Sequence, residues 1–394
     1  MIEVGDSSHY LGFAMTTINP FRITIPENDL DDLRRRLGAV RWPDRETPED
    51  WRQGIPLDYV KELCAYWHDE YDWRRCESWL NDQAQYTTEI DGLDFHFLHI
   101  RSPHAHALPL VITHGWPGSI IEFAKVIGPI TDPAAYGGDN ADAFHLVCPS
   151  LPGFGFSGKP TGPGWGVDRV GRAWGELMAR LGYDRYVAQG GDWGAIITAC
   201  MGMSEVKHCA GIHMNMPVVN PSKAAMQDLT DFEKDALADA QHYWDWDSGY
   251  SKEQSTCPQT LGYGLTDSPV GQAAWIIEKF WAWTDCQGHP ENALTRDELL
   301  DNVMMYWLPG AAASSARMYW ESFRVITQKQ EAVNIPTGVS IFPREIFRAS
   351  RRWVEERFKH LVHYNVLDKG GHFAAFEQPD IFVDELRTCF RHMR

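Results

Sequence analysis

One acidic residue stands where an apolar strand gives way to an apolar helix. Residues 187 to 197 read V-A-Q-G-G-D-W-G-A-I-I, with Asp192 between Gly191 and Trp193. A carboxylate in such surroundings loses hydration and gains little from packing, so its presence needs an explanation. Helix capping is one explanation, and a glycine-rich turn that cradles a phosphate is another. The third is chemistry, because small residues that flank one functional residue at a strand-to-helix turn are typical of a nucleophile elbow.

Two glycine-rich motifs follow other predicted strands. H-G-W-P-G-S (114–119) predicts a tight turn whose backbone N–H groups point into a crevice, although an ordinary strand-to-helix turn would also explain it. P-G-F-G-F-S-G (152–158) contains G-x-G-x-x-G, which must open a helix in order to bind a dinucleotide. The prolines and glycines that follow it prevent a helix from starting there. We therefore interpret this motif as a loop over the crevice and exclude nucleotide binding.

A histidine and a glutamate complete the set of candidate residues. His372 in D-K-G-G-H-F-A-A-F-E (368–377) comes just after the last predicted strand. A packed core histidine would explain it, but this is also where a general base belongs downstream of a nucleophile. The chain order nucleophile, acid, histidine requires a carboxylate after the strand predicted at 335 to 341. I-F-P-R-E-I supplies Glu345 there.

The periodicity of apolar residues predicts the elements that position these side chains. Residues 1 to 90 have the helical pattern, and residues 218 to 320 are helical and rich in tryptophan. Between and after these regions, strands alternate with helices, which predicts a mostly parallel sheet with helices on both faces and a ligand crevice at the carboxyl ends of its strands. Strands are predicted at 93–100, 108–113, 144–149, 186–189, 210–216, 335–341 and 361–367, and helices at 120–127, 168–181 and 195–203. The expected parts are an N-terminal helical segment (1–90), an α/β core in two parts (91–217 and 321–394) and a helical cap (218–320).

Composition excludes several classes of partner. The formal net charge of -18 argues against nucleic acid and anionic membrane surfaces, which select basic proteins. The eight cysteines are scattered without metal-ligand spacing, so we expect free thiols in a reducing compartment. We see no signal peptide and no apolar run of the ~20 residues that a membrane helix needs. We therefore expect a cytoplasmic protein with no membrane anchor. The sequence leaves the oligomeric state open, with a homodimer as one option.

The sequence resembles epoxide hydrolases of the microsomal type, within the α/β-hydrolase superfamily, over nearly its whole length. The resemblance implies conversion of an epoxide and water to a vicinal diol without cofactor or metal. It also implies a cap inserted in an α/β-hydrolase core and an N-terminal segment that wraps the core and meets the cap. The motifs that carry it are R-W-P (41–43), Y-D-W-R (71–74), I-D-G-L-D-F-H-F-L-H, H-G-W-P-G-S, G-G-D-W-G, D-S-P-V-G (267–271), P-T-G-V-S-I-F-P-R-E and G-G-H-F-A-A-F-E.

An aspartate suits this reaction better than a serine. Serine attack on an epoxide would leave an ether, which the same machinery could not hydrolyse. Asp192 is expected to be ionised at neutral pH, since Asp titrates near ~3.9, and it would form an alkyl ester that water can cleave. His372 would activate that water while Glu345 orients the imidazole. By their position in the two turns, the backbone N–H groups of Trp116 and Trp193 would hold the oxyanion.

Two cap tyrosines hydrogen-bond the epoxide oxygen in this family. The resemblance assigns them to Tyr250 in S-G-Y-S (248–251) and Tyr319 in R-M-Y-W-E (317–321). The sequence departs from the family pattern in the cap, where Cys257 replaces an expected basic residue and Pro309 an expected threonine. Both departures concern substrate range. Other cap tyrosines, which could be core aromatics, are Tyr243, Tyr263 and Tyr306.

Two other functions use the same fold. A haloalkane or haloacid dehalogenase has the same Asp nucleophile and the same histidine but needs halide-holding donors, which Trp116, Trp193 and the Trp-rich cap could supply. The tyrosine pair and Glu345 favour the epoxide. A catalytically silent ligand-binding protein would lack a member of the constellation, and none is missing. An esterase would need a nucleophilic serine in place of Asp192.

Overall fold

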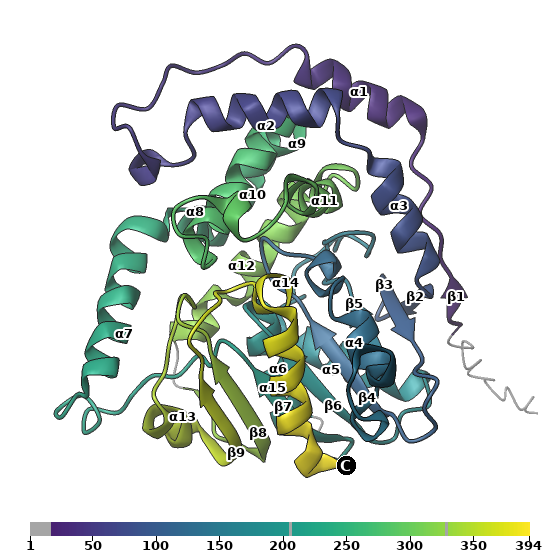
Figure 1. Ribbon diagram of the computed structural model, residues 1–394, viewed down its shortest axis with the longest axis vertical. Coiled ribbons are helices and arrows are strands. Elements are labelled where there is room, and N and C mark those ends of the chain that lie inside the picture. The colour runs from purple at the N-terminus through teal and green to yellow at the C-terminus, as the bar shows by residue number, and fades with distance from the viewer. Residues whose placement is uncertain (1–16, 205–206, 328–329) are drawn as a thin grey trace, which may run out of the picture.

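A mostly parallel sheet forms the centre of the molecule (Figure 1). The computed structural model describes residues 17–204, 207–327 and 330–394. Within these residues, nine strands pair in the order β1-β2-β3-β5-β4-β6-β7-β8-β9. Their bounds are β1 Asn19–Pro20, β2 Gln85–Ile90, β3 Leu93–Ile100, β4 Leu108–Thr113, β5 Phe144–Pro149, β6 Tyr186–Gly190, β7 Cys209–Met214, β8 Val333–Ile341 and β9 Phe358–Val366.

The direction of pairing changes once across the sheet. Each neighbouring pair among β1, β2, β3 and β5 is antiparallel, and each neighbouring pair from β5 through β4 to β9 is parallel. Every residue of β6 is buried, as expected for a strand of a parallel sheet covered on both faces. The carboxyl ends of β4, β6 and β7 therefore lie at one edge, where the elbow and its neighbours follow them.

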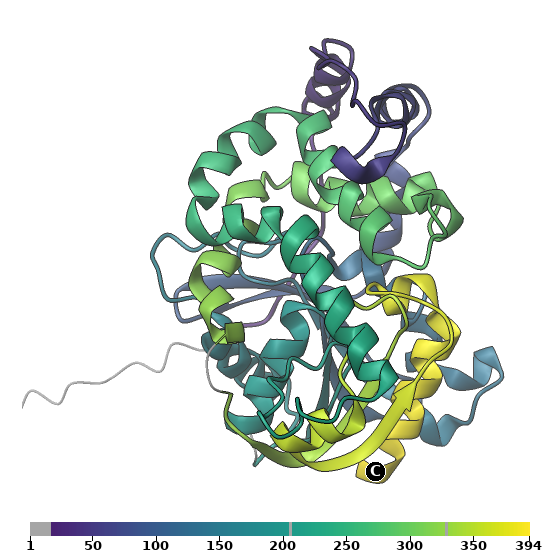
Figure 2. The same ribbon diagram turned by 90° about the vertical axis from the view of Figure 1, so that its left-hand side faces the viewer.

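Helices cover both faces of the sheet and one of its ends. In Figure 1, α4 and α15 lie in front of the sheet, and α5 and α6 lie behind it. Helices α8 to α12 of the cap lie above the carboxyl ends of the strands, whereas α7 runs down the left-hand side of Figure 1 beside the sheet. Figure 2 shows α1 and α2 on the far side of the cap from the sheet. The helix bounds are α1 Glu27–Leu37, α2 Leu57–Asp69, α3 Trp73–Asp82, α4 Ile127–Thr131, α5 Val167–Arg180, α6 Trp193–Ser204, α7 Asp231–His242, α8 Gly249–Thr256, α9 Pro258–Asp267, α10 Pro269–Trp283, α11 Arg296–Trp307, α12 Ala312–Thr327, α13 Arg351–Arg357, α14 Ala374–Glu377 and α15 Pro379–Phe390.

The predicted elements agree with the structure where apolar runs are bounded by turns. The strands predicted at 93–100, 108–113 and 144–149 have the predicted bounds. The helix predicted at 120–127 is wrong: a short 3-10 turn spans Ile120–Phe123, and α4 starts only at Ile127. Pro129 lies in the first turn of α4, where proline is tolerated, and Pro133 ends the helix after five residues because the preceding Asp132 cannot stay helical. The cap boundary expected at 320 falls inside α12, which continues to Thr327.

The N-terminal segment contacts both the core and the cap. Its strands β1 and β2 extend the sheet, and its helices α1 and α2 cross the outside of the cap (Figures 1 and 2). The Tyr71 hydroxyl donates to Asp301 in α11 at 2.7 Å, and Arg75 pairs with the same carboxylate at 2.7 Å. The Trp51 ring stacks on Trp281 of α10, with ring centroids 4.9 Å apart. The segment thus joins the cap to the sheet.

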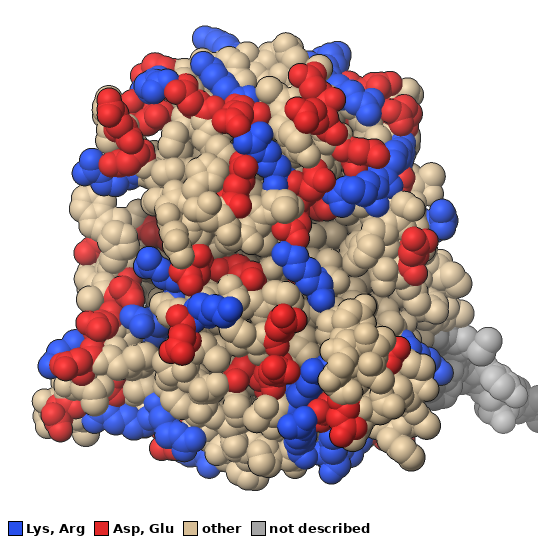
Figure 3. Space-filling view, in the orientation of Figure 1, with Lys and Arg blue, Asp and Glu red and all other residues tan. Residues whose placement is uncertain are grey.

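Surface charge and helix length are the features relevant to binding of a nucleic acid or a membrane. On the face seen in Figure 3, acidic and basic side chains are interspersed over the cap and the core, so this face has no extended basic patch for a nucleic acid. In the part of the chain that the structure describes, every helix is too short or too polar to cross a membrane.

Candidate active site

Asp192 occupies a sharp turn between β6 and α6. Its φ is 51°, in the left-handed region that side chains other than glycine rarely adopt. Neighbouring glycines make this turn possible, because a Cβ at Gly190 or Gly194 would overlap backbone atoms and a Cβ at Gly115 would overlap the Asp192 carboxylate. Such a backbone conformation costs about 1 to 3 kcal/mol and persists only where the surroundings fix it. This is the strand-to-helix elbow that the sequence predicted.

The two oxygens of the Asp192 carboxylate have different neighbours. Oδ1 accepts a hydrogen bond from the backbone N–H of Trp116 at 2.9 Å. Oδ2 lies 3.3 Å from Nε2 of His372. The side chain therefore contacts other functional groups, which is not the arrangement of a helix cap. One oxygen is held by a backbone donor, and the other is the better placed to react.

His372 lies in the loop between β9 and α14, where several contacts fix its position. Its backbone N–H donates to the carbonyl of Trp283, at the end of cap helix α10, at 2.9 Å. Its Nδ1 lies 2.6 Å from Oε1 of Glu345, which follows β8. Glu345 Oε1 also accepts from the backbone N–H of Ile346 at 2.8 Å, and Oε2 from Nδ2 of Asn215 at 3.4 Å. The imidazole is thus held between the Asp192 and Glu345 carboxylates.

The charge of His372 depends on both carboxylates. Burial by itself would lower the pKa of His372, but the negative charge of Glu345 and the hydrogen bond with Asp192 raise it well above its usual value. The resting imidazole therefore carries a proton at neutral pH. Any reaction that neutralises Asp192 removes part of this stabilisation and lowers the pKa of His372, which makes it a better base.

The two tyrosines assigned by resemblance lie above the elbow. The Tyr250 ring stacks on Trp116 with centroids 4.8 Å apart, and the Tyr319 ring contacts Trp193 edge-on, also at 4.8 Å. The two tyrosine rings are 5.7 Å apart. Burial, and then neighbouring groups that include Asp192, raise the pKa of both phenols well above 10, so both keep their protons. Tyr243 was not among the predicted residues, yet its hydroxyl lies 3.0 Å from that of Tyr250.

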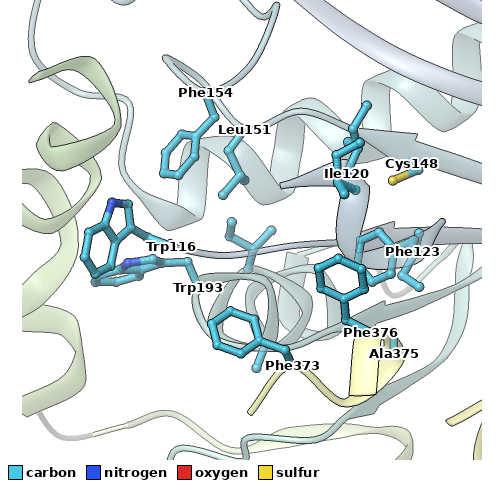
Figure 4. Close-up of a cluster of buried hydrophobic side chains, with 14 of the residues drawn as sticks. Trp116, Ile120, Phe123, Cys148, Leu151, Phe154, Trp193, Phe373, Ala375 and Phe376 are labelled. Atoms are coloured by element: carbon cyan, nitrogen blue, oxygen red, sulfur yellow. The ribbon is translucent and has the colours of Figure 1, made fainter. Parts of the chain in front are cut away.

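Two hollows meet at Asp192. The first, called here the cap-side hollow, lies between the elbow and the cap, and the second, the core-side hollow, lies among the carboxyl ends of the strands. In Figure 4 Trp116 and Trp193 lie side by side, directed toward the cap, at the edge of the buried apolar cluster. Besides Asp192, the cap-side hollow is lined by Trp193, Tyr243, Tyr250, Tyr319, Phe323 and Phe347, among others, and the core-side hollow by Thr113, Glu122, Gln189, Asn215, His372 and Phe373, among others.

His114, the first residue of H-G-W-P-G-S, has a structural role in the turn after β4. Its Nδ1 lies 2.9 Å from the carbonyl of Gly115, and its Nε2 accepts from the backbone N–H of Leu151 at 3.3 Å. Burial lowers the pKa of His114 to about 4, so the ring is neutral. Both ring nitrogens are occupied, and the ring fixes the turn that presents the Trp116 N–H.

The remaining sequence features lie away from the elbow. P-G-F-G-F-S-G forms a loop, as predicted, and helix α5 begins only at Val167. The hydroxyl of Ser314 in α12 donates to the carbonyl of Gly153 at 2.6 Å and attaches this loop to the cap. Cys257 is exposed ahead of α9, and the carbonyl of Pro309 accepts from Lys159 at 2.5 Å. Neither departure lines the hollows at Asp192.

An α/β core, an elbow and an acid–histidine pair in this chain order define an α/β hydrolase. Two family descriptions match the sequence: "Epoxide hydrolase N terminus" over residues 18–123 and "alpha/beta hydrolase fold" over residues 109–250. A protein of Stigmatella aurantiaca that carries a provisional epoxide hydrolase name is 55% identical over 377 residues, which cover 96% of this chain and 86% of that protein.

Two solved structures resemble this one closely. The juvenile hormone epoxide hydrolase of the silkworm Bombyx mori matches with a TM-score of 0.89 and 32% identity, over 96% of this chain and 95% of that one. The Aspergillus niger epoxide hydrolase matches with a TM-score of 0.87 and 31% identity, over 96% and 97%. The chain belongs to the epoxide hydrolase family of the α/β-hydrolase superfamily.

Proposed function

We propose that the protein converts an epoxide and water to a vicinal diol through a covalent ester on Asp192. The observation that carries this proposal is that the two oxygens of the Asp192 carboxylate have different neighbours. Oδ1 accepts the Trp116 N–H, and Oδ2 lies beside His372 and is free of backbone donors. The proposed substrate is an epoxide that approaches Asp192 from the cap side, where the lining is mainly aromatic.

In the first step, Oδ2 of Asp192 attacks an epoxide carbon and the carbon–oxygen bond of the ring breaks. The departing oxygen takes a proton from Tyr250 or Tyr319. The phenols can serve as this acid because they remain protonated at neutral pH. The product is an alkyl ester of Asp192 with a free hydroxyl on the adjacent carbon.

In the second step, water cleaves the ester. Ester formation neutralises Asp192, so the pKa of His372 falls and the imidazolium releases its proton, which restores the phenol used in the first step. The neutral Nε2 can then take a proton from water. Glu345 stabilises the resulting imidazolium through Nδ1. The hydroxide attacks Cγ of Asp192, and the negative charge develops on Oδ1, where Trp116 donates and where we also assign the N–H of Trp193. Collapse releases the diol, whose alkoxide takes the proton from His372. The proton of the new Asp192 carboxyl group then passes to the imidazole, which regenerates the carboxylate and the resting charge state.

Dehalogenation is a weaker alternative for the same site. Trp116 and Trp193 lie beside Asp192, as a halide site would require. A departing halide needs no proton, however, and Tyr250 and Tyr319 provide proton donors that only an alkoxide would use. A non-catalytic role would leave the complete set of Asp192, His372 and Glu345 without a purpose.

The test is a single turnover of styrene oxide in oxygen-18 water, followed by mass spectrometry of the peptide that contains Asp192. The ester mechanism places the isotope in the Asp192 carboxylate and leaves the first diol mostly unlabelled. Labelled diol with an unlabelled peptide would mean direct attack by water and would overturn the proposal. Release of bromide from 1-bromobutane under the same conditions would favour the dehalogenase.

We further propose that the enzyme acts in the cytoplasm. None of the eight cysteines is paired in a disulfide and seven are buried, as in proteins of reducing compartments. A homodimer remains a prediction, for which light scattering of the purified protein gives the mass in solution.

A further inference from the structure

The core-side hollow has the size of a single water molecule. It encloses about 20 Å³ against Asp192 and His372, beside the carboxyl ends of β4 and β6. A cavity of this size holds one water if the polar groups around it can bond that water. The question is therefore which of its polar groups lack partners within the protein.

Two buried side chains in this hollow have unused polar atoms. Thr113 and Gln189 are 0% and 1% exposed, and neither Thr113 Oγ1 nor Gln189 Oε1 has a hydrogen-bond partner among the described residues. Polar atoms that are buried without partners are rare in proteins. Two in one small hollow point to a bound polar molecule that supplies the missing bonds.

A hydrogen-bond chain fixes the orientation of Gln189. The Glu345 carboxylate can only accept, so Asn215 must present Nδ2 to it, at 3.4 Å. Asn215 Oδ1 then faces Gln189 and accepts from its Nε2 at 3.1 Å. This leaves Gln189 Oε1 as an acceptor outside this hydrogen-bond chain, while Glu345 contacts Nδ1 of His372 at the other end.

Glu122 supplies a third polar group, and the reaction just proposed has no use for it. It lies in the 3-10 turn Ile120–Phe123, and its carboxyl group occupies the space where Gly118 lacks a side chain, since a Cβ there would overlap it. Burial first, offset in part by His372 and reinforced by Asp192, raises the pKa of Glu122 to about 8. The carboxyl group is therefore mainly protonated at neutral pH and can donate a hydrogen bond, with Glu377 as a further acid nearby.

We propose that Glu122, Thr113 and Gln189 hold the hydrolytic water on the side of Asp192 opposite the substrate. This proposal rests on the ester mechanism. The water accepts from Glu122 or Thr113 and donates one hydrogen to Gln189 Oε1 and the other to His372 Nε2. One lone pair remains for attack on Cγ of Asp192. His372 takes the proton in that attack, and Glu122 keeps its own.

The experiment compares the two chemical steps in Glu122→Leu and Glu122→Gln. The quench of Trp fluorescence in a stopped-flow burst with styrene oxide gives the rate of ester formation, and quenched-flow mass spectrometry of the intact protein gives the rate of ester decay. We expect Glu122→Leu to slow ester decay by on the order of 30-fold, because the water is no longer positioned, and to change ester formation by less than about threefold. Glu122→Gln keeps a neutral donor and should recover most of the decay rate.

A matched pair of threonine variants controls for buried polarity. Thr113 and Thr198 are both 0% exposed with unpartnered hydroxyls, but only Thr113 lines the hollow. Thr113→Val should slow ester decay by about fivefold, the value of one hydrogen bond, and Thr198→Val by less than about twofold.

Three outcomes would overturn the water site: equal slowing of both steps in Glu122→Leu, no recovery in Glu122→Gln, or equal effects of the two threonine variants. If the wild-type protein formed no ester at all, the proposed function itself would fail, and the burst would reveal this separately.

Discussion

The two hollows that meet at Asp192 differ in the polar groups that line them. The cap contributes the aromatic rings of Tyr250 and Tyr319 on one side. The strand ends and the turn after β4 contribute the polar groups of Gln189 and Glu122 on the other. The difference matches the two steps of the proposed reaction, because an epoxide binds best among apolar groups with one acid and a water needs several hydrogen-bond partners. The predictions that follow separate the two sides, from the largest expected effect to the smallest.

Loss of the group that both hollows share should stop the reaction entirely. Asp192→Ala is expected to lower diol formation by about 10⁴-fold or more, because no nucleophile remains at the elbow. Chromatography of the diol measures this, with thermal melting as the control for folding. Turnover near the wild-type rate would show that water attacks the epoxide directly and that the two hollows do not serve separate chemical steps.

Loss of the base should affect the core side only. His372→Gln is expected to lower steady-state turnover by about 10³-fold while leaving ester formation possible. Mass spectrometry of the intact variant should then find one equivalent of protein heavier by the mass of the epoxide. An unmodified His372→Gln protein after incubation with styrene oxide would contradict the assignment of His372 to the second step alone.

Loss of a phenol should affect the cap side only. Tyr250→Phe and Tyr319→Phe are each expected to slow ester formation by about 10 to 100-fold, because the alkoxide loses one of its two proton donors. Tyr263, which is 71% exposed, provides the control variant Tyr263→Phe with no expected change. Full activity of both active-site variants would show that the acid has been assigned to the wrong residues, with Tyr243 as the next candidate.

The two sides should also differ in their response to pH, with only ester decay changing between pH 5 and 10. Ester decay requires neutral His372, so its rate should fall about tenfold for each unit by which the pH drops below the pKa of His372 in the ester. Ester formation requires protonated Tyr250 and Tyr319, whose raised pKa values keep it unchanged until strongly alkaline pH. Separate measurement of the two rates between pH 5 and 10 checks this. Parallel pH profiles would mean that one group controls both steps.

The smallest expected effect concerns the chain behind the histidine. Asn215→Ala removes one hydrogen bond from Glu345 and one from Gln189. We expect ester decay to slow by about fivefold, with ester formation unchanged, because the imidazole and the water are positioned less well. A larger effect on ester formation than on decay would place Asn215 on the substrate side.

The parts of the molecule that follow local rules could be predicted from the sequence. The strands that carry the elbow are apolar runs bounded by turns, so their bounds were predicted closely. The edge strand β1 was missed because its partner is distant in the sequence, as in the register of Asn19 against Thr87. Strand β2 was missed although it forms a hairpin with β3 through the turn Asp91-Gly92, a local signal that the helical interpretation of residues 1–90 overlooked. Two residues of β1 carry no pattern of their own, and Q-Y-T-T-E-I is too polar to stand out.

The residues of the candidate site also differ in how well the sequence predicts them. The sequence placed Asp192, His372 and Glu345 after predicted strands, and the structure brings them within hydrogen-bond distance. The sequence could not indicate Glu122, which reads as an ordinary acid after two isoleucines. Its burial follows from the turn that folds its carboxyl group over Gly118. Asn215 carried a usable signal, since it directly follows β7, next to the strand that leads to the elbow.

The left-handed backbone at Asp192, which the proposed reaction uses, lowers the stability of the fold. With φ at 51°, Asp192 occupies a conformation that glycine adopts without penalty. An Asp192→Gly protein should be inactive and yet unfold at a higher temperature than the wild type in thermal melting, because glycine relieves the backbone strain and removes a buried carboxylate. The native sequence is therefore not the most thermally stable one for its own fold, and selection for thermal stability alone would remove the nucleophile.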